Sequence, residues 1–160
     1  MNNEKFNYWA GSLGGYLTAI SHLNDQQGFR HSFFADIVDQ KHSTLEDSIC
    51  KRLKINDIKL IKSASELDTI KLFASTVKRN VFNNFLLGDH LKNKEIENLI
   101  KERIQWHIEE YITLIETISE IRPESWSAKV NRGNSEIEYI FFRFDKHIMM
   151  VGFSHTKKVV

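Results

Sequence analysis

Residues 93–121 read NKEIENLIKERIQWHIEEYITLIETISEI and form the longest uninterrupted helical pattern in the chain. Most of the apolar residues in this stretch recur at steps of three and four, which places them on one stripe of a helix with 3.6 residues per turn. Asn93 can cap the start of the helix, and Pro123 lies just beyond its end. We expect the stripe to face the protein core, and its members are Ile96, Leu99, Ile100, Ile104, His107, Tyr111, Ile115 and Ile118.

The opposite side of this helix carries a row of glutamates. Glu95, Glu102, Glu109 and Glu116 are spaced by seven residues, so the row drifts by only about 20° per heptad and runs almost parallel to the helix axis. This spacing predicts a solvated acidic face.

Shorter helical patterns precede the long helix. The periodicity predicts helices over about 4–24, 31–40, 44–54 and 66–87. The segment 55–62, INDIKLIK, fits either a short strand or a helical turn. In the first of these helices Gly11 and Gly15 lie one turn apart, and we expect them to provide a smooth surface for close approach of another helix or strand.

After Pro123 the period of the apolar residues changes from 3.6 to 2. This change predicts strands at 126–130, 137–144 and 147–153, joined by turns at 131–134 and 145–146 into an antiparallel meander. The middle strand is apolar on both sides, so both of its faces must be covered. The simplest arrangement lays the long helix over one face and the N-terminal helices, or another chain, over the second.

These patterns predict an α+β fold, in which N-terminal and central helices pack on a small C-terminal meander. At 160 residues the chain is expected to be one domain, mainly helical over 1–122 and a β-meander over 123–160. The hydrophobic share of 41% and the charged share of 27% are those of a globular protein.

The cysteine content and the hydropathy favour a soluble protein of the cytoplasm. Cys50 is the single cysteine, so an internal disulfide is excluded, and we expect it to act as a small buried hydrophobe. The N-terminal sequence does not resemble a secretion signal. No apolar run reaches the roughly 18 residues that a membrane helix needs.

Charge is unevenly distributed along the chain although the net charge is only +1. Residues 1–50, 51–92, 93–124 and 125–160 carry −3, +5, −4 and +3, respectively. Such segregation favours charged partners if folding keeps the charges apart as surface patches, whereas folding can also interleave them again. The basic block at 51–92 lacks the overall basic charge and the motifs of a nucleic-acid binder, so we expect no direct nucleic-acid contact.

The seven histidines do not complete a known catalytic or metal-binding motif. His107 and Glu110 are helical neighbours, but no second such pair supplies the remaining ligands of a metal site, so neither metal nor cofactor is expected. His107 itself is expected to be a hydrogen-bonded core residue. An enzyme with dispersed histidines, namely a small phosphoesterase or nuclease, remains an alternative. It would need two histidines to meet in one pocket with a lysine or arginine, and the candidates are His22, His31, His42 and His155.

Two segments carry a family resemblance, namely YWAGSLGGYLTAISHL at 8–23 and EYIFFRFDKHIMMVGFS at 138–154. Together with the small size, the near-neutral charge and the charge patches, they make the chain resemble the immunity proteins of bacterial polymorphic toxin systems, especially those of contact-dependent growth inhibition. The resemblance implies a non-enzymatic cytoplasmic inhibitor. Such a protein binds one cognate toxin domain, commonly a nuclease, and blocks its active site or an exosite.

A nuclease toxin binds a polyanion and therefore has a basic cleft, so acidic surfaces are the natural candidates for contact with it. A third alternative is a non-enzymatic interaction module whose exposed meander edge pairs with a partner strand. The protein can be a monomer, whereas a homodimer joined through the meander edge would favour this third alternative. The candidate partner-binding residues are Glu102, Glu109, Glu110 and Glu116 on the long helix, with Asp36, Asp39, Glu46 and Asp47 as a second acidic surface.

Overall fold

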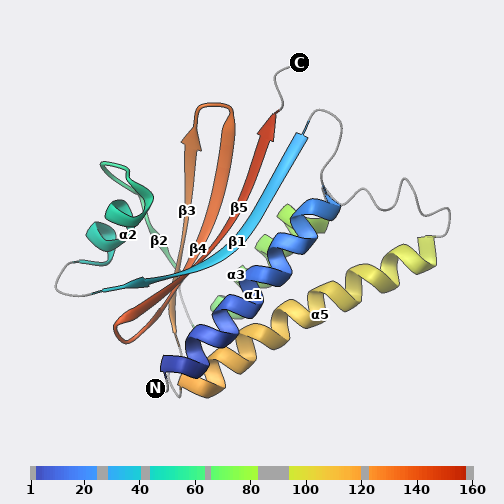
Figure 1. Ribbon diagram of the computed structural model, residues 1–160, viewed down its shortest axis with the longest axis horizontal. Helices are drawn as coiled ribbons and strands as arrows, with labels where there is room; N and C mark the ends of the chain where they lie inside the picture. Colours follow the sequence, from blue (N-terminus) through green and yellow to red (C-terminus); the bar gives the residue numbers. More distant parts are fainter. Residues whose placement is uncertain are drawn as a thin grey trace.

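The computed structural model describes residues 3–24, 29–40, 44–63, 66–82, 94–119 and 123–157. Helices and one antiparallel sheet pack together, so the predicted α+β class is confirmed (Figure 1). The elements in chain order are α1 (Asn3–Leu23), β1 (Phe29–Asp39), α2 (Leu45–Leu53), β2 (Ile61–Lys62), α3 (Glu66–Val77), the π-helical turn η1 (Lys78–Phe82), α5 (Lys94–Ser119), β3 (Glu124–Arg132), β4 (Ser135–Phe144) and β5 (His147–Lys157).

The sheet has five antiparallel strands in the order β1-β5-β4-β3-β2. Strands β3, β4 and β5 form the predicted meander, and its two turns hold Gly133 and Asp145 at positive φ. Strand β1 comes from the N-terminal part of the chain and pairs with β5 over its whole length. The sheet therefore joins segments that are far apart in the sequence.

Strand β1 replaces the helix predicted at 31–40, so that prediction was wrong. Phe33, Phe34, Ile37 and Val38 match a helical stripe by spacing, but in the strand Phe33 and Ile37 face one side of the sheet while Phe34 and Val38 face the other. Since both faces are covered, the strand is apolar on both sides. Such a strand can imitate a helical period over four or five residues.

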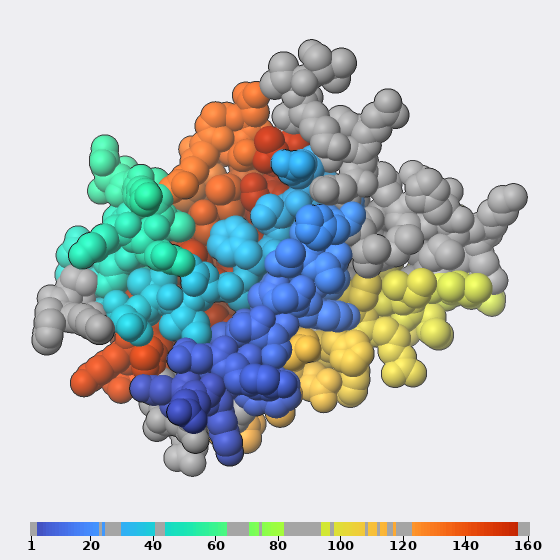
Figure 2. Space-filling view, in the orientation of Figure 1, coloured from blue at the N-terminus to red at the C-terminus, as the bar shows by residue number. Residues whose placement is uncertain are grey.

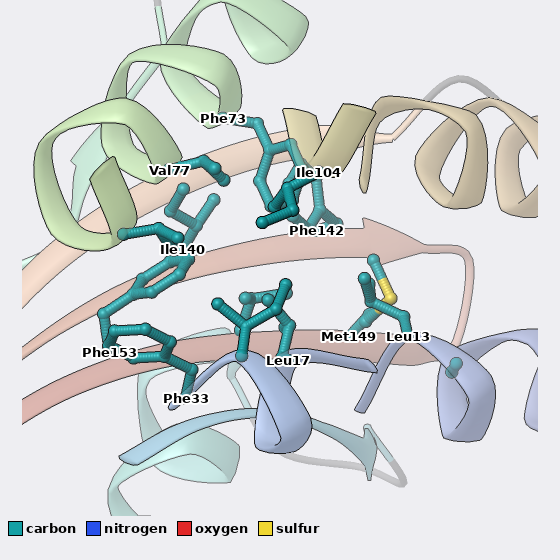
Figure 3. Packing of buried hydrophobic residues seen from close by; sticks show 14 of the residues in the cluster. Leu13, Leu17, Phe33, Phe73, Val77, Ile104, Ile140, Phe142, Met149 and Phe153 are labelled. Atoms are coloured by element: carbon teal, nitrogen blue, oxygen red, sulfur yellow. The ribbon is translucent and has the colours of Figure 1, made fainter. Parts of the chain in front are cut away.

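Helices α1, α3 and α5 all lie on one face of the sheet (Figure 1). The core on this side joins these helices to alternate residues of β1, β4 and β5, and Figure 3 shows how their side chains meet. Phe142, in the middle strand, is fully buried and lies edge-on to Phe73 of α3, with ring centroids 5.6 Å apart. The residues labelled in the figure are Leu13, Leu17, Phe33, Phe73, Val77, Ile104, Ile140, Phe142, Met149 and Phe153.

The second face of the sheet is covered by α2 and by the irregular segment 55–60, which resolves the ambiguity at 55–62 into a loop followed by the short strand β2. Among the helices predicted near the N-terminus only α2 lies on this face, because α1 shares the first face with α5. Thr44 caps the start of α2 by accepting a hydrogen bond from the Asp47 N–H. Lys54 ends the helix in the left-handed conformation.

Helix α1 covers the outer edge of β1. A Cβ atom at Gly14 would lie 3.1 Å from the carbonyl oxygen of Ala35, and the Thr18 hydroxyl donates to the Phe33 carbonyl at 3.4 Å. The close approach therefore occurs at Gly14 rather than at Gly11 and Gly15, where an added Cβ would meet nothing within 4 Å. An edge strand covered in this way is shielded from pairing with other chains.

The helix predicted at 66–87 is α-helical only as far as Val77 and continues as the π-helical turn η1; residues 83–87 lie outside the described part of the chain. At the wider turn the side-chain amide of Asn80 donates to the Thr76 carbonyl at 2.9 Å. Single π-turns inside helices are frequent at functional sites, and this one directs Arg79 and Asn80 toward the sheet.

Candidate functional site

The long helix α5 is held by a narrow inner stripe. Ile104 is buried, and Ile100 and Tyr111 are half-buried against the core on the helical face of the sheet. The Tyr111 ring lies 6.1 Å from that of Trp9 and 5.8 Å from that of Tyr16, measured between centroids. These aromatic contacts fix α5 against α1.

The predicted core stripe of this helix was too wide. Ile96, Leu99 and His107 are exposed rather than buried, and the side chains of Ile115 and Ile118 lie outside the described set. The reason is that α5 packs mainly on two other helices, α1 and α3, so a narrow strip of contact suffices. The ring of His107 lies at the surface beside Tyr16, with centroids 5.8 Å apart.

The outward face of α5 carries two large exposed apolar side chains. Leu99 is 61% exposed and Trp106 is 53% exposed. They are seven residues apart, so they lie on one row of the helix, and Glu102 projects from the same side. In Figure 2 α5 runs along the lower right of the molecule, while α2 lies at the opposite side of the view.

Three of the predicted acidic residues, Glu102, Glu109 and Glu110, have described side chains on α5. Glu102 is exposed and forms no ion pair with any described residue. Glu109 accepts a hydrogen bond from the Gln105 amide at 2.8 Å, and a carboxylate oxygen of Glu110 lies 3.6 Å from Nδ1 of His107. Glu116 belongs to the helix, but its side chain lies outside the described set. We define the outward α5 face as Leu99, Trp106, Glu102, Glu109 and Glu110.

The second predicted acidic surface is itself divided by the sheet, because Asp36, Glu46 and Asp47 lie on the α2 side whereas Asp39 lies on the helical side with its cross-strand partner His147. Asp36 and Asp39 lie on β1, where Asp36 accepts from Nε of Arg52 at 2.7 Å and Asp39 lies 2.9 Å from Nδ1 of His147. Their charges therefore have nearby basic partners. Glu46 and Asp47 are exposed in the first turn of α2, where carboxylates favour the positive end of the helix dipole. The structure thus does not join the two acidic sets into one surface.

A buried polar network on the helical face of the sheet joins the four elements β1, β4, β5 and η1. Nδ1 of His31 and Nδ1 of His155 are 2.8 Å apart on the paired strands β1 and β5, and Nε2 of His155 contacts Oδ1 of Asn80 at 2.8 Å. Asn80 in turn donates to the Glu138 carboxylate at 2.8 Å. Arg79 completes the network with a bidentate ion pair to Glu138. Its Nε donates to Oε2 of Glu138 at 3.2 Å, and its Nη2 donates to Oε1 at 2.5 Å.

Burial and hydrogen bonding set the protonation of this network. Burial, together with the neighbouring His31, lowers the pKa of His155. Burial alone would raise the pKa of the Glu138 carboxyl, but hydrogen bonds from Arg79 and Asn80 and the positive charge of Arg79 outweigh it and hold that pKa below its ordinary value. The network therefore combines a neutral histidine with an ionised carboxylate.

Two of the histidines proposed for an enzyme thus meet, and an arginine belongs to the same network. However, both ring nitrogens of His155 already contact protein atoms, and the guanidinium of Arg79 is held by Glu138. A phosphoester would need these groups turned toward it. The arrangement is that of a buried structural network that ties the π-turn to the sheet.

Metal and thiol chemistry find little support in the described residues. Within them no group of three or more His, Cys, Asp or Glu side chains gathers around a possible ion. Cys50 is only partly buried, and burial and the nearby Asp57 carboxylate raise the pKa of its thiol, which disfavours a reactive thiolate. None of the described helices combines the length and apolar character that a membrane span requires.

Trp106 and the network were missed by sequence reasoning. Trp106 stands four residues after Glu102, on the polar side of the helical pattern, and a tryptophan placed among glutamates was an available signal for an exposed apolar contact. No local signal pointed to the contact of His31 with His155, because these residues are 124 positions apart.

Comparison with known proteins identifies the fold alone. No family model matches the chain, and no curated protein matches it. Two crystal structures of citrus MAF1 share its fold. In one crystal form the TM-score is 0.53 at 8% identity, covering 91% of this chain and 99% of the MAF1 chain. In the other the TM-score is 0.50 at 10% identity, with 90% and 99% covered. At such low identity the likeness does not extend to function.

Proposed function

We propose that this protein binds a partner protein with a basic surface through the outward α5 face and thereby neutralises it, as an immunity protein neutralises its toxin. The single observation that carries the proposal is the exposure of Leu99 and Trp106 on one helical row among glutamates. The family resemblance of the sequence supports the same function, with a nuclease as the toxin and the bacterial cytoplasm as the compartment.

The apolar pair supplies the anchor of the proposed interface. Binding hot spots are enriched in tryptophan, and they are surrounded by residues that exclude water without contributing much energy themselves. Trp106 is the exposed tryptophan of α5, and Leu99 extends its surface by two helical turns. Burial of these two side chains would favour a stable complex over a purely electrostatic encounter.

The surrounding carboxylates supply attraction and selectivity. Complementary charge raises the association rate and excludes partners of the wrong sign. A nuclease cleft is basic because it holds a polyanion, so Glu102, Glu109 and Glu110 match it in charge. Helix α5 has 26 residues, which corresponds to a rigid rod of about 39 Å, long enough to lie across such a cleft.

The proposal implies a non-enzymatic protein that acts without metal or cofactor. The candidate enzymatic site is the contact of His31 with His155, and we expect no hydrolysis of RNA, DNA or small phosphoesters by the purified protein. Phosphoesterase turnover that is abolished by His155→Ala, in a variant that keeps its fold, would contradict the non-enzymatic proposal.

The test needs the natural partner. The proposal predicts that the gene next to the one for this chain encodes a large protein with a toxin domain at its C-terminus. That domain serves as the probe in calorimetry and in a growth-protection assay. We expect Trp106→Ala to weaken binding by at least tenfold, and the pair Glu102→Lys and Glu109→Lys to slow association and reduce its dependence on salt.

Glu46→Lys on α2 is the matched control, because it reverses an exposed carboxylate on the other face of the sheet. It should leave binding and protection unchanged. If Glu46→Lys disrupts the complex while the α5 variants bind normally, the binding surface lies around α2. If no neighbouring toxin domain binds the protein at all, the immunity function is wrong.

A further inference from the structure

A groove of about 450 Å³ lies between the edge strand β2 and helix α3, away from the outward α5 face. Its apolar part is formed by Ile61 and Leu72. Lys71 lines the groove from the helix and Lys62 lines it from the strand, although the Lys62 side chain lies on the opposite face of the sheet, with Nζ 5.5 Å from the centroid of the Trp126 ring. The groove is open to solvent and runs beside the end of the sheet.

Strand β2 leaves backbone hydrogen-bonding groups on its outer side. The Ser63 N–H donates to the Ser125 carbonyl at 2.9 Å. In an antiparallel pair every second residue directs its N–H and C=O toward the partner strand, so Ser63 and the residue two positions before it direct these groups toward β3. Lys62 lies between these two residues, so its N–H and C=O point away from β3. They have no hydrogen-bond partner within the described part of the chain.

The side chains beside this edge favour an apolar contact. Ile61 is 60% exposed, which is unusual for a large β-branched residue on a strand, and the half-buried Leu72 lies across the groove from it. A strand added to β2 would direct alternate side chains to the same face of the sheet as the groove. One apolar side chain from that strand could be buried between Ile61 and Leu72.

The charge at the groove is basic. Lys71 is exposed and forms no hydrogen bond or ion pair with any described residue. On the strand side Nζ of Lys62 is held by the Glu124 carboxylate at 2.6 Å. Glu124 is also paired with Arg143, so its charge is already shared between two cations.

We propose that the β2–α3 groove binds an extended acidic segment of a partner protein, which adds to β2 as a further strand. Backbone hydrogen bonds to Lys62 provide part of the affinity, and a negatively charged sequence with apolar residues provides the selectivity. A short strand and a lysine also protect a sheet edge against aggregation, so the proposal depends on the groove beside the edge. It is independent of the outward α5 face.

The probe is a labelled ten-residue peptide of alternating glutamate and valine, blocked at both ends. Fluorescence anisotropy measures its binding to the full chain. The control peptides are the alternating lysine–valine sequence and a glutamate–valine peptide with alternate backbone nitrogens methylated. Of these three peptides, we expect only the acidic peptide with the unmodified backbone to bind at concentrations up to the millimolar range. Equal binding of the methylated peptide would overturn strand addition, and an absence of binding would overturn the site.

Two pairs of variants separate the contribution of the outward backbone N–H of Lys62 from that of the charge of Lys71. Lys62→Pro and Lys62→Ala both remove the side-chain charge, but only proline removes the outward N–H, and proline is tolerated where that N–H faces solvent. We expect Lys62→Pro to bind about tenfold more weakly than Lys62→Ala. Lys71→Glu should reduce binding at least tenfold, whereas Lys51→Glu on α2 should not change it.

Other occupants have distinguishable outcomes. A concentration-dependent dimer in sedimentation that disappears in Lys62→Pro would show that a second copy of this chain occupies the edge, and it would overturn the acidic-partner proposal. Competition by inorganic phosphate as strong as that by the peptide would show a simple anion site and would equally overturn it. Circular dichroism on each variant confirms that the fold is retained.

Discussion

Phe34 lies with its ring over Gly152, its cross-strand partner, so closely that a Cβ atom at Gly152 would stand 2.3 Å from Cζ of Phe34. The ring fills the space that a side chain at position 152 would occupy, and it also contacts Tyr139 edge-on at 6.1 Å between centroids. The glycine thus allows an aromatic side chain to lie flat on the sheet beneath α2.

Gly152→Ala is expected to destabilise the fold by about 1–3 kcal/mol, because the added methyl group displaces the Phe34 ring. In an ordinary strand position the same change would be neutral or stabilising. Urea denaturation of Gly152→Ala, Phe34→Leu and the double variant measures the coupling. We expect the alanine to become much less destabilising in the Phe34→Leu background; strict additivity would show that the ring is not the obstacle.

Phe142→Ala is expected to reduce the free energy of unfolding by about 3–5 kcal/mol, since it empties a fully buried position between β4 and α3. Thermal and urea unfolding measure the loss. The conservative Phe142→Leu serves as the control and should lose much less. A loss below about 1 kcal/mol for the alanine variant would mean that the surrounding helices do not close on the strand as described.

The burial of His155, together with its contact with His31, makes stability depend on pH. Because the pKa of His155 is lowered in the fold, the unfolded chain binds the proton more readily between that lowered pKa and the ordinary value of about 6.5. Stability should therefore fall as pH decreases through this window. The carboxylates of Glu136 and Glu138 oppose the shift but do not reverse it.

Urea midpoints between pH 7.5 and 5 measure this dependence. His155→Gln should flatten the curve in this range, whereas His107→Gln, at an exposed position on α5, should leave its slope unchanged. An identical slope in wild type and His155→Gln would assign the pH dependence to other groups.

Arg79→Met is expected to destabilise the protein by about 1–2 kcal/mol, because it leaves the mostly buried Glu138 carboxylate with Asn80 as its remaining close donor. The arginine itself is half-exposed, which keeps the effect below that of a fully buried pair. Lys129→Met, which breaks the exposed pair with Glu136, is the control and should change stability by less than about 1 kcal/mol. Equal effects of the two changes would argue against a special role for the network.

Replacement of Glu102 and Glu109 by lysine should leave the fold intact, with a change below about 0.5 kcal/mol for each, because neither carboxylate is buried in the core. Circular dichroism and thermal unfolding check this expectation. It matters for function, since a loss of partner binding by these variants can be assigned to the surface only if the stability is unchanged. A large fall in melting temperature would mean that the acidic row has a structural role.

The parts of the fold that local pattern could predict are those whose partners are near in sequence. The meander follows from period-two alternation and two short turns, and α5 follows from its long helical period. Strand β1 escaped prediction because its pairing partner β5 lies far along the chain and because both of its faces are apolar.

The candidate site was predictable in its charges and not in its apolar anchors. The glutamate row of α5 could be read from its heptad spacing. The exposure of Leu99 depends on how little of α5 the neighbouring helices cover, and no local pattern contains that information. The meeting of His31 with His155 likewise depends on the register between β1 and β5.

The pairing of β1 with β5 also constrains how the protein folds during synthesis. His31 leaves the ribosome 124 residues before its partner His155, so β1 cannot pair with its neighbour while most of the chain is still being made. A sheet closed by such a distant contact forms slowly compared with one built from hairpins. Until β5 is synthesised, α1 can cover only the outer edge of β1, and the edge that will pair with β5 stays open on the nascent chain.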